Sequence, residues 1–227
     1  NNQKIVFTNI DDAIQKEKAI GIKQFCFGLN ESNVDAKINN IEANPMVKIV
    51  YNKQIINSHL IGIYNANNIN AAITIGAYFK VSDEQIKEAI ENYIPENNRS
   101  QLLQKNGNEI ILDAYNANPS SMAAAIMNFI QLDKQNKIAI LGDMFELGTE
   151  SLLEHKKIID LLSSETNIIT YFIGNDFYAN KIQNPHIKFF ENFEQFAAFL
   201  HTNQPKDSLI LIKGSRGMAL EKTLELL

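Results

Sequence analysis

An apolar run followed by a polar segment occupies positions Ile110-Ile-Leu-Asp-Ala-Tyr-Asn-Ala-Asn-Pro-Ser-Ser-Met122. The apolar residues predict a short buried strand, and the amides, hydroxyls and proline after it predict the start of a helix. Open α/β sheets bind ligands at the carboxyl ends of their strands, so Asp113 is a candidate to accept hydrogen bonds from a ribose diol. Candidate donors to a phosphate or carboxylate are Asn116, Asn118, Ser120 and Ser121. A polar loop with ordinary Asn-Pro turn chemistry has the same composition, so this segment alone leaves both interpretations open.

From residue 99 onward, short apolar strands alternate with amphipathic helices. Strands are expected at 102–104, 109–112, 137–141, 168–173, 187–190 and 208–213, and helices at 120–132, 150–162, 176–182, 193–201 and from 218 to the end. Asn106-Gly107 predicts a hairpin turn between the first two strands. Because strands that are apolar throughout must be covered on both faces, this part is expected to be an α/β domain with a doubly wound, mostly parallel sheet.

The first 98 residues have a different pattern. Strands at 4–8 and 25–28 around a helix at 13–19 predict a parallel α/β layer, and the runs 46–51 and 54–60 predict an antiparallel ribbon after it. One helix is expected over 63–79, and a capping box at Ser82-Asp-Glu-Gln85 begins another that ends before Pro95. Because Glu96-Asn-Asn98 has the polarity of a linker, we expect two domains, 1–98 and 99–227.

Composition narrows the class of protein. Lys and Arg number 21 against 26 Asp and Glu, and a net charge of -5 argues against nucleic acid as the main partner, so small-molecule substrates are expected. A single cysteine, Cys26, excludes an internal disulfide and a cysteine-based zinc site, which fits the cytoplasm. No apolar run approaches the length of a membrane span. The first residues, Asn1-Asn-Gln-Lys4, are neither a signal peptide nor a natural start, so we expect a fragment of a longer protein, which we expect to be monomeric.

Polar residues follow the expected strands at 113–116, 142–148, 174–176 and 213–217. None of these segments is a Gly-x-Gly-x-x-Gly fingerprint, and Lys213-Gly-Ser215 lacks the upstream glycines of a Walker A loop. Lys213 and Arg216 are nevertheless candidates to bind an anion beside a helix start. Basic side chains next to a glycine turn also occur without any ligand, so this alternative stays open.

Further candidates lie outside the strand ends. Four asparagines, Asn65, Asn67, Asn68 and Asn70, open the helix expected at 63–79, which is more than helix capping requires. The surplus amides are candidates to pair with the N6 and N7 edge of adenine. Arg99 could, as a planar guanidinium at a domain junction, make a two-pronged contact with a terminal phosphate, although a lone Arg is also explained as a solvated charge. His155, expected on a surface helix, and Glu146, in a strand-end loop, are weaker candidates for ligand contacts.

Five segments in this order resemble the Mur ligases, from about residue 4 to the end of the chain. They are Gly62-x-Tyr-Asn-x-x-Asn68, Arg99-Ser-Gln101, residues 113–122, Leu141-Gly-Asp-Met-x-Glu-Leu-Gly148 with His155, and Lys213-Gly-Ser-Arg216. Two of them, Tyr115-Asn-Ala-Asn-Pro119 and Gly142-Asp-Met-x-Glu-Leu-Gly148, resemble most closely the branch that adds D-alanyl-D-alanine to a UDP-N-acetylmuramoyl-tripeptide. Alternatives are another ligase of the superfamily, such as a folylpolyglutamate synthase, and a non-catalytic nucleotide-binding module.

The resemblance implies an ATP-dependent ligase of peptidoglycan synthesis that acts through an acyl phosphate. Residues 1–98 would be the later part of the central ATP-binding domain, and 99–227 the C-terminal Rossmann-like domain. The N-terminal domain, the P-loop and the Mg²⁺ ligands would lie upstream, so this fragment is expected to be inactive alone. Tyr64 stands where many relatives carry a His, so a metal-binding role of that His does not transfer.

The resemblance also implies roles for individual residues, with no metal ligand among them. Asn65 and Asn68 would hold adenine, Asp113 the ribose and Arg99 the terminal phosphate, and Arg99 and Lys213 would be catalytic. The pocket for the incoming dipeptide would be formed by Tyr115, Asn116, Asn118, Ser121, Asp143, Met144, Glu146, His155, Lys213, Ser215 and Arg216.

Overall fold

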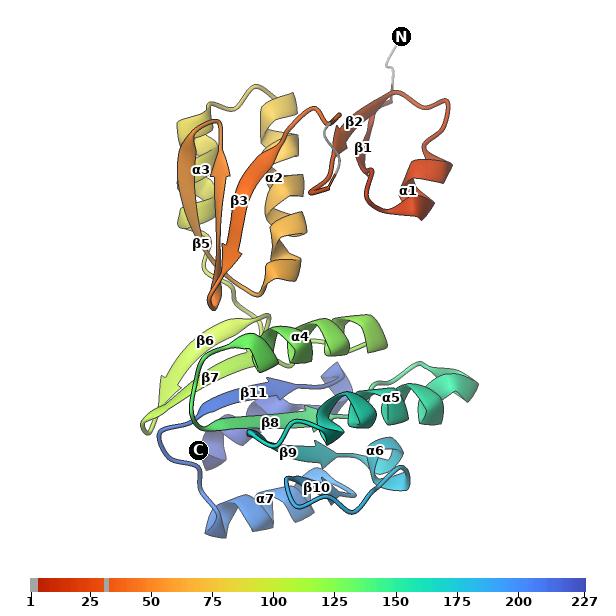
Figure 1. The fold of residues 1–227 in the computed structure, drawn as a ribbon, viewed down its shortest axis with the longest axis vertical. Coiled ribbons are helices and arrows are strands. Elements are labelled where there is room, and N and C mark those ends of the chain that lie inside the picture. Colours follow the sequence, from red (N-terminus) through yellow and green to blue (C-terminus); the bar gives the residue numbers. More distant parts are fainter. Residues whose placement is uncertain (1–3, 31–32) are drawn as a thin grey trace. The chain divides into compact units, whose positions relative to one another are not determined.

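The chain forms two compact units, Asn1–Ile94 and Pro95–Leu227, in a computed structural model that describes residues 4–30 and 33–227 (Figure 1). The sequence analysis found no signal peptide in the first residues, and residues 1–3 lie outside the described part. The second unit begins at Pro95, whereas the sequence placed the domain boundary at residue 99.

The first unit combines a small parallel pair of strands with an antiparallel sheet. Strand β1 (Val6–Asn9) pairs in parallel with β2 (Gln24–Phe27), and α1 (Ala13–Lys18) connects them. The expected ribbon is confirmed as an antiparallel pair, β4 (Met46–Tyr51) and β5 (Gln54–Ile61). A strand that the sequence did not predict, β3 (Ile38–Ala43), joins it to form a three-stranded sheet in the order β3-β4-β5.

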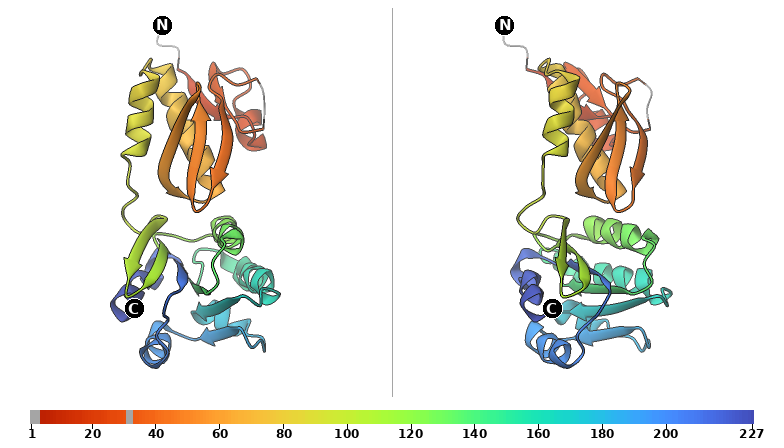
Figure 2. Two further views of the ribbon diagram at one scale, coloured as in Figure 1. Left: turned by 60° about the vertical axis from the view of Figure 1, so that its left-hand side comes forward. Right: turned by 90° about the vertical axis from the view of Figure 1, so that its left-hand side faces the viewer.

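Two helices cover one side of this antiparallel sheet (Figure 2). The helix expected over 63–79 begins as a 3-10 turn, η1 (Ile63–Asn65), and continues as α2 (Ala66–Tyr78). The capping box at Ser82 is confirmed and starts α3 (Asp83–Glu91). Ile69 and Ile73 of α2 and Ile86 of α3 are buried in one cluster with the strand residues, so burial of apolar area holds the helices on the sheet.

The second unit is built on a six-stranded sheet in the order β10-β9-β8-β11-β7-β6 (Figure 1). Its strands are β6 (Gln101–Lys105), β7 (Asn108–Asp113), β8 (Lys137–Gly142), β9 (Ile168–Ile173), β10 (Ile187–Phe190) and β11 (Leu209–Lys213). Only the β6–β7 pair is antiparallel, and Asn106 and Gly107 form its turn with φ of 48° and 82°. The expected mostly parallel sheet and its hairpin are therefore confirmed.

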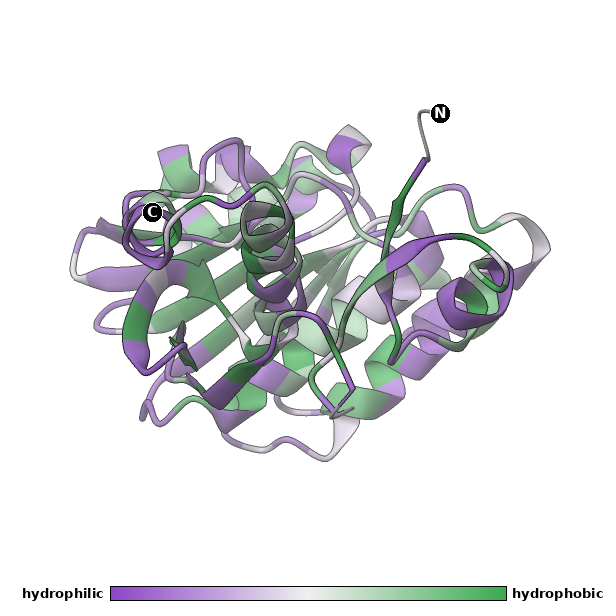
Figure 3. Ribbon diagram, turned by 90° about the horizontal axis from the view of Figure 1, so that it is seen from above, coloured by the Kyte–Doolittle hydropathy of each residue, from purple (hydrophilic) through white to green (hydrophobic). Residues whose placement is uncertain are grey.

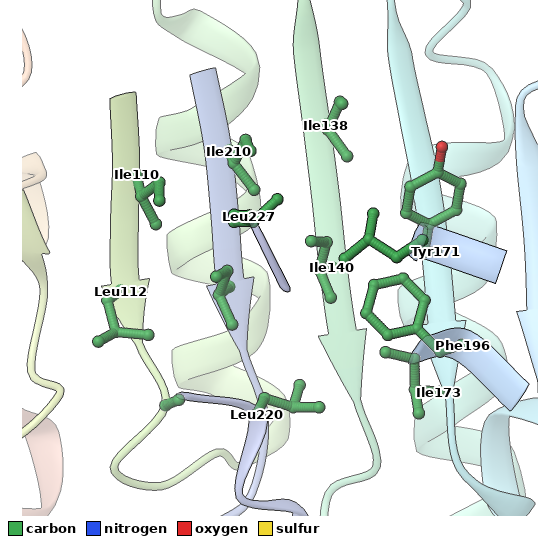
Figure 4. Close-up of a cluster of buried hydrophobic side chains, with 13 residues drawn as sticks. Ile110, Leu112, Ile138, Ile140, Tyr171, Ile173, Phe196, Ile210, Leu220 and Leu227 are labelled. Carbon is green, nitrogen blue, oxygen red and sulfur yellow. The ribbon is translucent and has the colours of Figure 1, made fainter. Parts of the chain in front are cut away.

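Helices cover both faces of this sheet, as expected for a doubly wound fold. Helices α4 (Pro119–Gln131), α5 (Ser151–Ser163) and α6 (Asn175–Ala179) pack against one another in series. Helices α7 (Phe193–Thr202) and α8 (Thr223–Leu226) pack together on the opposite face. Figure 4 shows Ile110, Ile140 and Ile210 from neighbouring strands pointing toward the side that carries Phe196 and Leu227. The strands of the sheet carry mostly the hydrophobic colour in Figure 3, because they are buried on both faces.

Two expected helices of this unit were wrong in extent. The helix expected over 176–182 ends at Ala179, and the helix expected from 218 onward is broken into η3 (Arg216–Met218), η4 (Leu220–Lys222) and α8. Ala219, with a φ of 49°, separates η3 from η4. The reason lies in packing: Leu220 is fully buried, and a Cβ added to Gly142 or Gly214 would lie 2.9 or 3.0 Å from it. Seating Leu220 against these glycines turns the chain out of a helical path.

Candidate functional site

A cavity of about 520 Å³ lies at the carboxyl ends of β7, β8 and β11, which are neighbours in the sheet. Three loops line it, one after each strand: Tyr115, Asn116, Ala117 and Asn118; Phe145, Glu146 and Leu147; and Ser215, Arg216 and Gly217. These strands are parallel to one another, so their carboxyl ends meet at one edge of the sheet. The cavity therefore occupies the place at which the sequence predicted ligand binding.

Several residues that the sequence singled out line this cavity together, namely Tyr115, Asn116, Asn118, Glu146, Ser215 and Arg216. Glu146 has a left-handed backbone, with φ of 64°. Arg216 has a 60% exposed side chain and its Nη1 lies 3.2 Å from Glu221 Oε1. A carboxylate and a guanidinium thus line the same cavity, which can hold a small molecule carrying both an amine and a carboxylate.

The loop that carries Glu146 is fastened to the loop after β11 by two hydrogen bonds. The Phe145 N–H donates to Ser215 Oγ at 2.8 Å, and the Ser215 N–H donates to the carbonyl oxygen of Asp143 at 3.1 Å. A Cβ added to Gly217 would lie 2.7 Å from the Phe145 ring, so this ring packs closely against the backbone of the loop after β11. Ser215 is buried, and it ties the loop after β8 to the loop after β11.

Asp143 lies behind the cavity, and its carboxylate is used within the protein. Its two oxygens accept the N–H groups of Asp176 and Phe177, each at 3.0 Å, at the start of α6. Burial raises the pKa of the Asp143 carboxyl, while the two N–H donors oppose this shift. Gly174 leaves the necessary room, because a Cβ there would lie 2.3 Å from this carboxylate. Asp143 therefore joins β8 to α6 and does not line the cavity.

His155 is fully buried, because it lies on the inward-facing side of the expected surface helix, α5, whose other side is exposed. Its Nε2 lies 2.9 Å from the Met144 N–H, which can only donate, and its Nδ1 lies 2.7 Å from the carbonyl oxygen of Ser151. These partners select the neutral tautomer with the proton on Nδ1. Met144 is fully buried as well, so both residues support the loop from behind the cavity.

Asp113 and Lys213 form an ion pair across adjacent strands. They face each other in the β7–β11 register, and Lys213 Nζ lies 2.6 Å from Asp113 Oδ2 and 3.2 Å from the carbonyl oxygen of Asn116. The other carboxylate oxygen, Oδ1, accepts the Ser100 N–H at 3.1 Å. The side chains of Lys213 and Asp113 are only 3% and 16% exposed. The sequence predicted both residues as ligand contacts but gave no indication that they bind each other.

Arg99 stacks on Tyr115, with its guanidinium carbon 4.0 Å from the centre of the ring. The Tyr115 N–H also donates to the carbonyl oxygen of Asn98 at 3.1 Å. The segment before β6 is thus held beside the cavity by one backbone and one side-chain contact. Sequence reasoning missed this contact. Among the lining residues it also missed Gly217, whereas Ala117, Phe145 and Leu147 lie within the loops 116–122 and 143–147, which the resemblance assigned to the dipeptide pocket.

The polar helix start after β7 is confirmed as a capping box. Asn118 Oδ1 accepts the Ser121 N–H at 2.8 Å, and Ser121 Oγ accepts the Asn118 N–H at 3.1 Å. Ser120 Oγ donates to Asn118 Oδ1 at 2.9 Å. Ser121 thus acts on the helix, and of these three residues Asn118 lines the cavity.

In the first unit, Asn65, Asn68 and Asn70, which lie before and within α2, also form hydrogen bonds within the protein. Asn65 donates from Nδ2 to the carbonyl oxygen of Ile61 at 2.7 Å and accepts the Asn68 Nδ2 at 2.8 Å. Asn70 donates to the carbonyl oxygen of Gly28 at 3.1 Å. Of the two residues predicted to hold adenine, Asn65 is the buried one, with 6% exposure, and its side chain is held within the protein.

The described residues, 4–30 and 33–227, hold no group of three or more His, Cys, Asp and Glu side chains that is arranged to bind a metal ion. Nor do they include a helix with the length and hydropathy needed to cross a membrane.

Known proteins resemble this chain over most of its length. The family model described as "Mur ligase, glutamate ligase domain" matches residues 98–216, more than half of the chain. The UDP-N-acetylmuramoyl-tripeptide--D-alanyl-D-alanine ligase of Treponema pallidum (strain Nichols) is 29% identical over 79% of this chain and 40% of its own. The ligase of the same name from Bacillus subtilis (strain 168) is 32% identical over 73% and 38%. A crystal structure of MurF from Acinetobacter baumannii has a TM-score of 0.82 and 26% identity, covering 99% of this chain and 51% of that one. The chain thus spans about half or less of the length of these proteins.

Proposed function

The chain belongs to the Mur ligase family, and we propose that it is part of a ligase that uses ATP to join D-alanyl-D-alanine to a UDP-N-acetylmuramoyl-tripeptide in peptidoglycan synthesis. Residues 1–98 are proposed to be the later part of the central ATP-binding domain, and 99–227 the C-terminal domain. We also propose that the protein works in the cytoplasm as a monomer. Because the chain spans 40% of one relative and 38% of another, the 227-residue piece is proposed to be inactive by itself.

The cavity is the observation that supports this function best. Its volume of about 520 Å³ and its pair of opposite charges, Glu146 and Arg216, suit a small zwitterion such as a dipeptide. We propose that Arg216 binds the carboxylate of the dipeptide and that Glu146 attracts its amine end. The amides of Asn116 and Asn118 line the same cavity and would bind the peptide group between the two ends.

The proposed reaction has two steps. First, a carboxylate oxygen of the tripeptide attacks the terminal phosphorus of ATP, which forms an acyl phosphate and releases ADP. Second, the amine of D-alanyl-D-alanine attacks the acyl carbon, the carbon–oxygen bond to phosphate breaks, and an amide, inorganic phosphate and a proton are formed. Such chemistry depends mainly on positioning and on stabilisation of charge.

The residues of the second unit are proposed to act as follows. Arg99 contacts the terminal phosphate, and Asp113 accepts hydrogen bonds from the ribose. Lys213, which the resemblance suggested as catalytic, is proposed to hold the Asp113 side chain in place, because its ammonium is buried against that carboxylate. Asp143, Met144 and His155 are proposed to shape the cavity from behind.

Asn65 and Asn68 of the first unit are proposed to hold adenine. The Asn65–Asn68 hydrogen bond supports different roles for the two residues: Asn68 contacts the base, and Asn65 orients the Asn68 side chain. Mg²⁺, which the family relationship suggests as a companion of ATP, has no matching group of side chains among the described residues, so no step of the reaction is assigned to a metal bound by this chain.

The test is a phosphate-release assay on the full-length protein that contains this chain. With ATP and the UDP-tripeptide, turnover is expected with D-alanyl-D-alanine and not with glutamate, L-alanine or diaminopimelate. Turnover that requires glutamate would identify a folylpolyglutamate-type ligase, and binding of nucleotide without turnover of any amine would identify a non-catalytic module. The 227-residue chain is expected to release no phosphate under the same conditions, and activity there would refute the proposal that it is incomplete.

A further inference from the structure

We propose that Tyr115 is a positioning residue that couples the phosphate contact of Arg99 to occupation of the cavity. The proposal deepens the proposed function, on which it rests for the identity of the two ligands. Its structural basis is that one side chain takes part in both places: the ring carries the Arg99 guanidinium at 4.0 Å, and the same residue lines the cavity.

The stack sets the direction in which Arg99 points. Arg99 is exposed, and among the residues that the structure describes it forms no ion pair, so the ring is its main side-chain contact. A guanidinium lying on an aromatic face keeps its N–H groups in a plane parallel to the ring, where they remain available to the oxygens of a phosphate. Without the ring, an exposed Arg samples many rotamers, and binding of a phosphate must then restrict them.

The backbone around Arg99 strengthens this arrangement. Asn97, Asn98 and Ser100 have φ of 57°, 58° and 48°, a left-handed conformation that is unusual for residues other than glycine. Contacts with the 113–115 segment accompany it: Asn98 accepts the Tyr115 N–H, and Ser100 donates to Asp113. Strained backbone of this kind persists where surrounding contacts hold it in place. The path of the chain on both sides of Arg99 is therefore fixed against the segment that carries Tyr115.

The cavity reaches Arg99 through the same ring. Tyr115 is 42% exposed and lines the cavity with Asn116, Glu146 and Arg216. A ligand packed against the ring restricts its motion and with it the motion of the stacked guanidinium, and restriction of the guanidinium by a phosphate restricts the ring in return. Coupling of this type is reciprocal, so occupation of either site strengthens binding at the other.

The stack is tested first in the 227-residue chain by the NMR signal of the Arg99 Nε–Hε group. A proton held near the face of an aromatic ring is shifted upfield, so Tyr115→Phe should keep the shift and Tyr115→Leu should remove it. Tyr178→Leu is the matched control, because it removes a different tyrosine that stacks on a cation, Lys181, at 4.3 Å. An Arg99 signal that is the same in wild type and Tyr115→Leu would overturn the proposal.

The coupling is tested by kinetics of the full-length protein. Tyr115→Leu is expected to lower kcat/KM for ATP by roughly 3- to 30-fold, the range that corresponds to loss of a cation–π contact, whereas Tyr115→Phe restores it to near the wild-type value. In wild type, saturating dipeptide should lower the Kd of a non-hydrolysable ATP analogue, and this effect should be lost in Tyr115→Leu and kept in Tyr115→Phe.

The outcomes are distinguishable. Loss of the NMR shift in Tyr115→Leu without a change in the mutual effect of the two ligands would refute the coupling and leave the proposed function standing. An inactive wild type with every amine would refute the proposed function and the coupling together, while the NMR comparison would still decide whether the stack exists in solution.

Discussion

Removal of the Lys213 ammonium should cost the second unit more stability than any surface charge does. In Lys213→Met the Asp113 carboxylate loses a partner at 2.6 Å, and the carbonyl oxygen of Asn116 loses a donor at 3.2 Å. Breaking a buried ion pair costs about 3 to 5 kcal/mol. Because the Asp113 side chain is 16% exposed and also keeps the Ser100 N–H, part of the lost interaction is replaced, and we expect the low end, about 3 kcal/mol.

Hydrogen exchange is the appropriate assay, since two units need not unfold together and the slowest amides report on their own unit. The amides of Ile111 and Leu211, buried in β7 and β11, should exchange about 100-fold faster in Lys213→Met, as expected for 3 kcal/mol. Lys134→Met is the matched control: its ammonium lies 2.7 Å from Glu109, on the same strand as Asp113, but the two side chains are 47% and 34% exposed. That variant should lose less than about 1 kcal/mol.

A double-mutant cycle separates the ion pair from other effects of the substitutions. Asp113→Asn, Lys213→Met and the double variant should give a coupling energy of about 1.5 to 3 kcal/mol, the range for hydrogen bonds to charged groups. A coupling energy no larger than that of the Glu109–Lys134 pair would show that the buried contact contributes nothing specific, and the positioning role proposed for Lys213 would fall with it.

Three further predictions concern groups around the site and in the first unit. Because burial raises the folded pKa of Asp143 above its ordinary value of 3.8, the folded protein binds this proton first as the pH falls. Its contribution to stability is then complete below the unfolded pKa and is lost as the pH rises through the folded one, so urea titrations should show wild type gaining stability relative to Asp143→Asn between pH 7 and 4. His155→Leu should leave the Met144 N–H without an acceptor, at a cost of about 1 to 3 kcal/mol in stability, whereas His155→Gln should cost less. Hydrogen exchange of the Met144 amide measures the loss of this hydrogen bond directly. Equal protection of that amide in the two variants would contradict the prediction. Burial, and to a smaller extent the charge of Asp35, raises the pKa of Cys26, so iodoacetamide at pH 8 should alkylate Cys26 more slowly than the thiol of a free peptide. The alkylation rate should partly recover in Asp35→Asn. An unchanged rate in that variant would rule out the effect of the Asp35 charge.

The candidate site contains residues that line the cavity and residues that hold its loops in place. Glu146 and Arg216 line the cavity. Ser215, which also lines it, and His155, which lies behind it, hold the loops in place. A loop held at successive residues loses little further freedom when a ligand binds, which favours affinity. Substitutions behind the cavity should therefore change its shape without touching a ligand.

Local sequence was sufficient for most of the helices and strands, although not for β3, and for the edge of the sheet that carries the site. Runs such as Ile110–Leu112 are strands because apolar residues in a row must be buried, and Asn106-Gly107 is a turn because its residues accept a left-handed backbone. Since strand ends in a parallel sheet meet at one edge, the polar segments after them could be assigned to one site before any contact was known. The helix boundaries near Ala219 were missed because the buried side chain of Leu220 overrides local preference.

Only the tertiary structure decided which of the selected residues face a ligand and which face each other. Strand β11 lies between β7 and β8, and this order brings Lys213 to Asp113 across 100 positions of sequence. The rotation of α5 buries His155, and the path of residues 97–100 lays Arg99 on Tyr115. Periodicity and turn chemistry act over a few residues, whereas these contacts depend on strand order and on side-chain packing between distant segments. Residue type therefore predicted a polar site at this edge, and the folded chain determined its geometry.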